Sequence, residues 1–223
     1  IHIDLAHLAQ FSGARLIVER CCGINADGKT LFFDSRPPLH FDLLSINIGG
    51  VPDLHGIEGA KNHVTPVKPI SFFQRSFEGL LQKTLPKKIA VIGGGAAGCE
   101  LALAINKRWR LHGVTPSITL YSRSNRLLSQ MSNRAANLML TKLHDSDIKV
   151  QLGRAVRKIE KTLLHFSQKE ENRRTTQKTS EVINFKEDYD ACFLVSAVHP
   201  PKWLSTSNLA LDDNGFISVL PTL

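Results

Sequence analysis

A run of glycines near the middle of the chain has the spacing of a phosphate-binding turn. Residues 93–98 read Gly-Gly-Gly-Ala-Ala-Gly and match the pattern G-x-G-x-x-G. The run directly follows the apolar segment 89–92 and directly precedes a segment of helical character, which is the context that the pattern requires. The first glycine then allows a tight turn, the second lets backbone approach a pyrophosphate, and the third lets the helix pack closely on the strand.

This motif predicts a dinucleotide whose pyrophosphate lies at the free N–H groups of the helix N-terminus. A glycine turn that binds no ligand is the alternative. The residues expected to contact the cofactor are Gly93, Gly94, Gly95, Ala96, Ala97 and Gly98.

The second strand of the unit ends without the carboxylate that usually binds the adenosine ribose. Ser122 stands at that position, and Arg123 and Arg126 follow it. Loss of the carboxylate removes repulsion against a 2′-phosphate, and a guanidinium can bind that phosphate through two hydrogen bonds. These three residues are therefore candidate cofactor contacts, and NADPH and NADH both stay open. The alternative is that both arginines are ordinary surface charges.

Glu100 is the acidic residue nearest to the glycine motif. It follows the last glycine by two residues, in the expected first turn of the helix. An acid there is stabilised by the helix dipole, and the second hypothesis is that it points into the cleft beside the nicotinamide.

The histidines lack HxxxH or HExxH spacing, and the four cysteines lack CxxC spacing. We therefore expect no metal site, and we expect reduced, buried thiols in a cytoplasmic protein.

The elements around the glycine motif follow a β-α-β order that predicts an α/β fold. The expected Rossmann-type domain has a central parallel sheet with helices on both faces and a covering antiparallel meander at 155–187. Its strands are expected at 88–92, 117–121, 148–152 and 189–196, and its helices at 96–111 and 133–144.

The residues before this domain predict short elements separated by turns. Helices are expected at 4–11 and 69–85, and strands at 14–22, 30–34 and 41–48. An Asp27-Gly28 turn joins the first two strands, because Asp-Gly tolerates the positive backbone angles of tight turns. Pro86 predicts a domain boundary.

Composition excludes several classes of protein. The chain has 42% hydrophobic and 22% charged residues, and no apolar run approaches the roughly 20 residues that cross a bilayer. We therefore expect no transmembrane segment, and a peripheral membrane location stays open. The net charge of +8 does not predict nucleic-acid binding, because basic stretches such as 169–178 contain no interleaved aromatic residues.

Several segments resemble one known family. GGGAAGCELA at 93–102 is similar to the NAD(P)H-binding segment of the FAD-dependent pyridine nucleotide-disulfide oxidoreductases, especially type II NADH dehydrogenase-like members. FDLLSINIGG at 41–50, YDACFLVSAVHPPKWL at 189–204 and LALDDNGFISV at 209–219 resemble further segments of that family in the same order. With HVTPVKPI at 63–70, they are most similar to the branch fused to, or encoded with, selenide, water dikinase.

The resemblance implies a flavoprotein in which NAD(P)H passes hydride to FAD and then to an unknown acceptor. Quinone, a selenium or sulfur compound and a protein partner are all open as acceptors. Glu100 matches the family's acid at the nicotinamide–flavin junction and is the predicted catalytic residue, and Gly49 matches a cofactor-binding position. The implied domains are a first FAD-binding segment at 1–85, an NAD(P)H-binding domain at 86–195 and a return segment at 196–223.

Two family motifs have no counterpart in these 223 residues: the first FAD-binding glycine motif and the later Gly-Asp motif. We therefore expect an internal fragment of a longer protein that binds FAD weakly or not at all by itself and is inactive in isolation. The sheet edge left by the missing first strand is a candidate for homodimer formation. A nucleotide sensor with the same fold, and an interaction protein with a vestigial site, are the alternative hypotheses.

Overall fold

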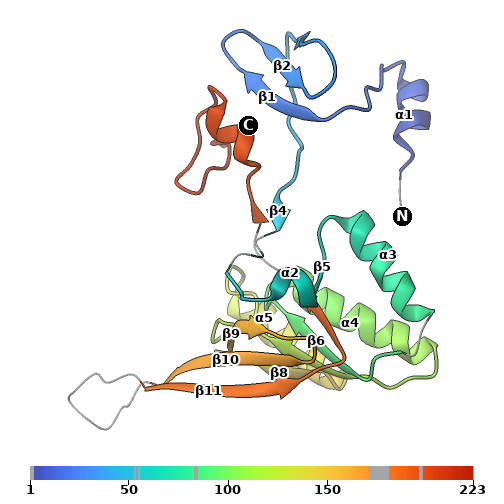
Figure 1. Ribbon diagram of the computed structural model, residues 1–223, viewed down its shortest axis with the longest axis vertical. Coiled ribbons are helices and arrows are strands. Elements are labelled where there is room, and N and C mark those ends of the chain that lie inside the picture. The colour runs from blue at the N-terminus through green and yellow to red at the C-terminus, as the bar shows by residue number, and fades with distance from the viewer. Residues whose placement is uncertain are drawn as a thin grey trace. The chain divides into compact units, whose positions relative to one another are not determined.

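The protein divides into two compact units, described here from a computed structural model (Figure 1). One unit comprises residues 51–198, and the other comprises residues 1–50 and 199–223. Residues 51–85, which the resemblance assigns to an FAD-binding segment, pack with the larger unit. The structure describes residues 3–52, 54, 56–82, 85–170, 181–195 and 198–222.

The larger unit is built on a five-stranded parallel sheet in the order β5-β12-β6-β7-β8. The central position of β6 sets Val91 beside Leu120 of β7 and Phe193 of β12. All five strands run in the same direction, so their carboxyl ends share one edge of the sheet. The strands are β5 (Thr65–Pro66), β6 (Lys88–Ile92), β7 (Ser117–Tyr121), β8 (Lys149–Gln151) and β12 (Ala191–Leu194).

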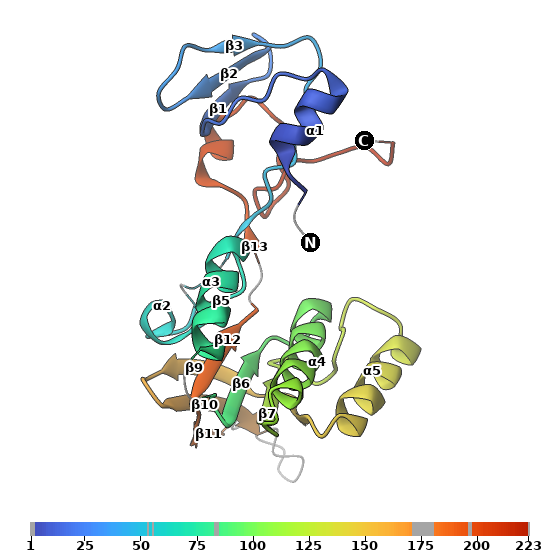
Figure 2. The same ribbon diagram turned by 90° about the vertical axis from the view of Figure 1, so that its right-hand side faces the viewer.

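Three helices pack on one face of this sheet, as Figure 2 shows: α3 (Ile70–Leu81), α4 (Ala96–Leu111) and α5 (Asn133–Asp145). Phe193 is fully buried beneath them, with its ring centroid 6.0 Å from that of Phe73 and 6.2 Å from that of Phe77 on α3. Trp109 of α4 is also fully buried, and its indole N–H donates to the carbonyl of Pro86 at 2.9 Å. These contacts fix α3 and α4 against the centre of the sheet.

The other face is covered by an antiparallel sheet in the order β11-β10-β9 and by the one-turn helix α2 (Ala60–His63). Its strands are β9 (Ala155–Ile159), β10 (Leu163–Glu170) and β11 (Glu181–Asp188). The α/β class and the covering meander are thus confirmed. Of the helices expected on both faces, this face has only the one-turn α2 among the described residues, because the chain between β8 and β12 forms paired strands rather than a crossover helix.

The smaller unit contains an antiparallel sheet in the order β1-β2-β3, together with α1 (Leu5–Ser12) and the short 3-10 helix η1 (Lys202–Thr206). The turn at 26–29 confirms the expected hairpin, although Lys29 rather than Gly28 has the positive φ, at 45°. The strands of this sheet are β1 (Cys21–Asn25), β2 (Thr30–Phe33) and β3 (Leu39–His40). A separate two-stranded pair, β4 (Val51–Pro52) with β13 (Val198–His199), lies where the chain passes between the units.

Two predicted strands of the smaller unit are wrong. The strand expected at 14–22 begins only at Cys21, and Val18 is 90% exposed. The apolar segment 41–48 has no strand, and Leu43 is 93% exposed. Both segments have the residue types of a strand, but among the described residues no neighbouring strand pairs with 14–20 or with 41–48. Within the part of the chain that the structure describes, no helix has the length and apolarity of a membrane span.

Phe193 offers a test of the core between the helices and the sheet. Replacing Phe193 by Ala should lower the free energy of unfolding of the larger unit by about 3–5 kcal/mol, because it removes a fully buried ring and leaves a cavity. The matched control is Phe72→Ala on α3, where the side chain is 46% exposed, and it should cost less than about 1 kcal/mol. Urea denaturation followed by tryptophan fluorescence measures both values. Equal losses would contradict this packing.

Candidate dinucleotide-binding site

The glycine turn lies at the carboxyl edge of the sheet, between β6 and α4. Gly93 follows β6 with a φ of +134°, a conformation that side chains rarely adopt. Its N–H donates to the carbonyl of Tyr121 at 2.9 Å, and Val195 donates to the carbonyl of Ile92 at 2.8 Å. The turn is therefore anchored to the ends of both strands that flank β6.

The three motif glycines are in different surroundings. A Cβ atom on Gly98 would overlap the carbonyl of Gly93, and one on Gly93 would overlap the carbonyl of Val195. A Cβ on Gly95, in contrast, would have no atom within 4 Å. Two glycines thus allow protein backbone to pack closely, whereas Gly95 faces open space. This division matches the roles expected from the motif, with the second glycine left for a ligand.

The N-terminus of α4 opens at the same place. Gly95 is the N-cap, and no side chain caps the helix there. The N–H groups of the first turn lack intrahelical acceptors, as in any α-helix, and carry partial positive charge. Ala96 and Ala97 are the first two helical residues, and their small side chains leave these donors accessible. The arrangement can therefore bind an anion at the open side of Gly95.

Glu100 is exposed and is the fifth residue of α4. It therefore lies beyond the first turn, which contains no acidic residue, so the expectation that it lies in that turn is wrong. The neighbouring Cys99 is fully buried, and burial raises the pKa of its thiol to about 11. Because that thiol stays neutral near pH 7, Cys99 is a packing residue beside the turn and not a nucleophile.

Ser122 takes the position of the usual ribose-binding acid, but its side chain is only 4% exposed. A Cβ on Gly94 would overlap the Ser122 hydroxyl, which shows how closely the glycine turn packs on this residue. The hydroxyl accepts from the N–H of Ser124 at 3.2 Å. Ser122 therefore shapes the loop after β7 at the place where a carboxylate would otherwise stand.

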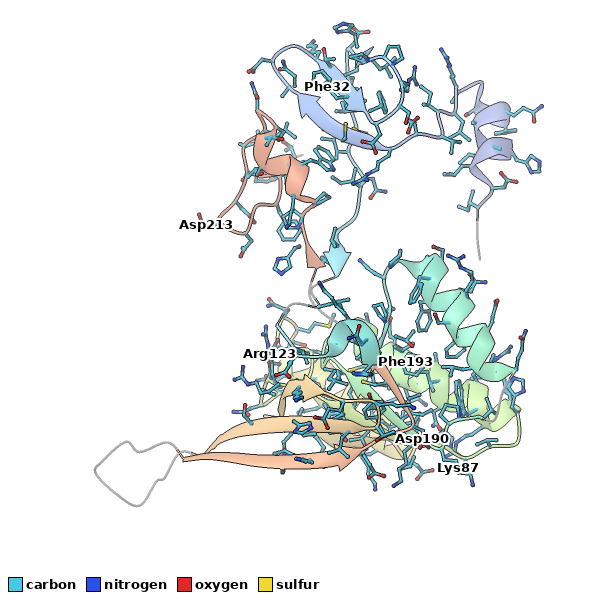
Figure 3. The ribbon with its side chains drawn as sticks, in the orientation of Figure 1. Phe32, Lys87, Arg123, Asp190, Phe193 and Asp213 are labelled. Atoms are coloured by element: carbon cyan, nitrogen blue, oxygen red, sulfur yellow. The ribbon has the colours of Figure 1, made fainter. Side chains whose placement is uncertain are left out.

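The two arginines after Ser122 differ in availability. The guanidinium of Arg126 donates to the carbonyls of Met131 (3.0 Å) and Ser129 (2.8 Å) and to Oδ1 of Asn133 (2.9 Å). It is thus engaged in closing the segment before α5. Arg123 is exposed (Figure 3), and among the described residues its guanidinium has no hydrogen-bond or ion-pair partner. The structure therefore leaves Arg123 as the available cation of this pair.

The loop after β8 also reaches this edge of the sheet. Arg154 donates its backbone N–H to the carbonyl of Ser122 at 2.8 Å, and Gly153 donates to the carbonyl of Ser124 at 3.1 Å. No sequence motif indicates Arg154. The available signal is its position three residues after the third strand of the β-α-β unit, β8, at the edge of the sheet where Ser122 follows β7.

Gly49 belongs to the other compact unit. Its φ is +65°, so a side chain there would be strained, and no atom lies within 4 Å of the place of a Cβ. Within the described part of the chain, no group of three or more His, Cys, Asp or Glu side chains forms a metal site.

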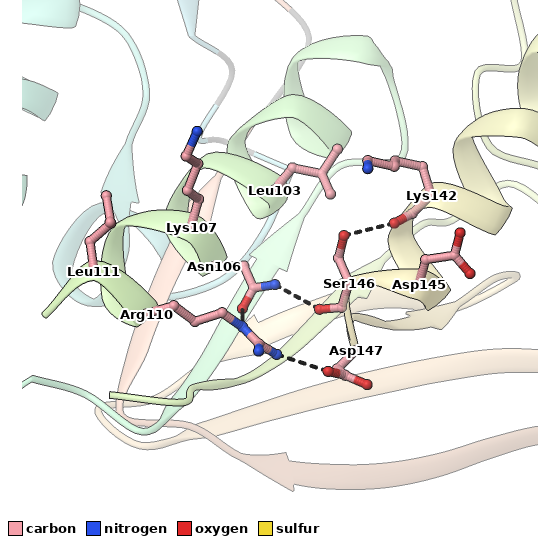
Figure 4. Close-up of a pocket in the computed structure, with 9 residues that line it drawn as sticks. All are labelled: Leu103, Asn106, Lys107, Arg110, Leu111, Lys142, Asp145, Ser146 and Asp147. Atoms are coloured by element: carbon pink, nitrogen blue, oxygen red, sulfur yellow. Dashed lines mark hydrogen bonds and ion pairs between the residues drawn. The ribbon is translucent and has the colours of Figure 1, made fainter. Parts of the chain in front are cut away.

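A separate open pocket of about 620 Å³ lies between α4 and α5 (Figure 4). It is closed at one end by hydrogen bonds from Asn106 to the carbonyl of Ser146 (2.6 Å) and from Arg110 to Asp147 (2.8 Å). Its residues come from the second half of α4, which runs away from the glycine turn, and from the end of α5 and the two residues that follow it. The pocket is therefore distinct from the anion site at the start of this helix. It is lined by Leu103, Asn106, Lys107, Arg110, Leu111, Lys142, Asp145, Ser146 and Asp147.

Comparison with known proteins finds one family match over nearly the whole chain. Residues 8–223 match the family described as pyridine nucleotide-disulphide oxidoreductase. A similar curated protein is the NADH dehydrogenase-like protein YutJ of Bacillus subtilis (strain 168), which is 21% identical over 137 residues. The match covers 61% of this chain and 38% of YutJ.

Solved structures share the fold at low sequence identity. The sulfide:quinone oxidoreductase of Aquifex aeolicus superimposes with a TM-score of 0.74 and 17% identity, covering 96% of this chain and 50% of that one. NDH2 from Plasmodium falciparum, solved in complex with NADH, gives a TM-score of 0.66 and 19% identity, covering 89% of this chain and 44% of that one. The chain thus spans half or less of the length of these proteins.

The different surroundings of the motif glycines can be tested by a pair of identical substitutions. Gly98→Ala should lower the free energy of unfolding by about 2 kcal/mol or more, because its Cβ would overlap backbone that cannot move freely. Gly95→Ala should change it by less than about 1 kcal/mol, since the new methyl group enters open space. Thermal or urea denaturation measures both variants. Equal destabilisation would refute the assigned geometry.

Proposed function

The chain belongs to the pyridine nucleotide-disulphide oxidoreductase family, and from this premise we propose that it is the NAD(P)H-binding portion of a flavin-dependent oxidoreductase. The observation that carries the proposal is the open position of Gly95 at the uncapped N-terminus of α4. A pyrophosphate placed there would accept hydrogen bonds from the first-turn N–H groups and interact favourably with the helix dipole. This support comes from geometry that is independent of the family match.

The loop after β7 favours NADPH as the nucleotide. A 2′-phosphate would be repelled by a carboxylate at the end of this strand, and Ser122 provides none. Arg123 is exposed, lies directly beyond Ser122 and has no polar partner among the described residues. Its guanidinium can therefore bind the phosphate with two hydrogen bonds, at no loss of an existing protein contact.

The chain's own residues would bind and orient the nucleotide, while bound nicotinamide and flavin would supply the hydride chemistry. Gly93 and Gly98 hold the turn against β6 so that Gly95 and the helix N–H groups face the pyrophosphate. The same proposal places Glu100 at the nicotinamide–flavin junction and makes Gly49 an FAD contact. Both of these roles rest on the family resemblance. Membership of the branch associated with selenide, water dikinase rests on that resemblance too, and the resemblance does not select the electron acceptor.

Nucleotide binding is tested by calorimetric titration of the chain with NADPH, NADH and FAD separately. Saturable binding of a nicotinamide nucleotide is expected, and Gly95→Val should weaken it by about tenfold or more, because the side chain would occupy the space of the pyrophosphate. Gly79→Val on α3 is the matched control, since a Cβ there also meets no atom within 4 Å, and it should bind normally. If neither nicotinamide nucleotide binds the unmodified chain, the proposal fails.

The choice of nucleotide is tested by removing the available cation. Arg123→Ser should weaken NADPH binding by about tenfold, the cost of losing charged hydrogen bonds to a phosphate, and leave NADH binding unchanged. Arg108→Ser, an exposed arginine near the end of α4, is the matched control and should affect neither nucleotide. Tighter binding of NADH than of NADPH by the unmodified chain would refute the NADPH preference.

A further inference from the structure

The loops after β7 and β8 lie side by side at the edge of the sheet where the nucleotide is expected. Besides the two backbone hydrogen bonds that join them, Gly153 has a φ of +68°, and a Cβ there would crowd Oδ1 of Asn125 at 2.7 Å. The second loop therefore packs closely against the residues that follow Ser122. A side chain from this loop can act on the same part of a ligand as Arg123.

Arg154 is the charged residue of this second loop, and its guanidinium is held by an aromatic ring. Its Cζ lies 3.9 Å from the ring centroid of Phe185 on β11, well within the range of a cation–π contact. Phe185 in turn stacks on Phe166, with centroids 4.8 Å apart and an interplanar angle of 5°. A cation–π contact of this kind holds the guanidinium over the ring without using its N–H donors.

The stack continues to β7 and is thereby fixed to the sheet. The ring centroid of Phe166 lies 4.8 Å from that of Tyr121, the last residue of β7. The Tyr121 hydroxyl donates to the carboxylate of Glu187 at 2.6 Å. Burial raises the pKa of Tyr121 well above its ordinary value, so the hydroxyl keeps its proton and this hydrogen bond persists at neutral pH. Arg154 is therefore positioned by the covering meander, relative to the same strand that leads to Arg123.

The guanidinium of Arg154 makes no hydrogen bond and no ion pair within the described part of the chain, although the residue is half-buried. The contrast with Arg157, three residues later, is clear: its Nε donates to the hydroxyl of Ser167 at 2.7 Å. Among the described residues, the Arg154 side-chain nitrogens are not buried atoms that lack a partner, so these donors reach solvent and are accessible to an anion. Arg123 directly follows Ser122, whose carbonyl accepts the backbone N–H of Arg154, and it is a second cation without a hydrogen-bond or ion-pair partner among the described residues.

We propose that Arg154 and Arg123 together bind the 2′-phosphate of NADPH, with Arg154 as a specificity-determining residue supplied by the loop after β8. The inference rests on the proposed function and extends it to a residue outside the segment after β7. In this arrangement Arg123 approaches from the exposed side, and Arg154 presents the edge of a guanidinium whose face is covered by Phe185. Two arginines from separate loops would bind a phosphate more selectively than a single mobile one.

The test compares adenosine 2′,5′-bisphosphate with 5′-AMP, and NADPH with NADH, as calorimetric probes of the full chain. Arg154→Gln should weaken binding of the bisphosphate and of NADPH by about tenfold and leave 5′-AMP and NADH unchanged. Phe185→Leu keeps the charge of Arg154 but removes the ring beneath it, so it should weaken binding only of the two probes that carry a 2′-phosphate, by about threefold. Arg157→Gln is the matched control and should change none of the four affinities.

The outcomes separate this inference from the proposed function. If the unmodified chain binds NADPH and Arg154→Gln leaves that affinity unchanged, the role of Arg154 is overturned while nucleotide binding stands. An equal loss for all four probes also overturns it, because Arg154 would then contact the shared adenosine or support the fold. If the unmodified chain binds none of the probes, the proposed function fails, and this inference fails with it.

Discussion

The close approach of α4 to the end of β6 is the contact on which the rest of the site depends. Gly98 lies so near the carbonyl of Gly93 that no side chain fits between them. This contact places the first turn of α4 directly at the carboxyl edge of the sheet, where its N–H groups are free. A larger residue at position 98 would push the helix away from the strand, and the proposed anion site would then lose its alignment with Gly95.

The strand β7 connects this site to both covering layers. Leu120 points into the core beneath the helices, whereas Tyr121 points into the core beneath the meander. Successive side chains of a strand face opposite sides, so the two cores meet at neighbouring residues. Directly after them, Ser122 packs against the glycine turn and accepts the backbone N–H of Arg154. The position of the site therefore depends on both layers, and the meander does more than shield one face of the sheet.

The central β-α-β elements could be predicted because local signals define each of them. Apolar strands, a glycine turn and a helix stop follow one another directly in this part of the sequence. The predicted bounds therefore agree with the observed ones for β6 (88–92), α4 (96–111) and β7 (117–121). The strand predicted at 41–48 is wrong because a strand needs a neighbouring strand to pair with. Local sequence does not encode whether such a neighbour is present. The same holds for the arginines: Arg123 and Arg126 are equivalent candidates by residue type and position, and only the hydrogen bonds of the folded loop distinguish them.

The number of cations near Ser122 says little about nucleotide choice, because three arginines of the same type have three different surroundings. Arg126 uses its donors to close a loop, Arg154 is stacked but has unused donors, and Arg123 is exposed. Absence of a carboxylate at Ser122 only permits a 2′-phosphate. Selection of NADPH over NADH additionally needs donors whose hydrogen bonds are not already made, since breaking existing bonds offsets the gain from new ones. Within the described part of the chain, the guanidinium groups of Arg123 and Arg154 have no hydrogen-bond or ion-pair partner and meet that condition, whereas Arg126 does not.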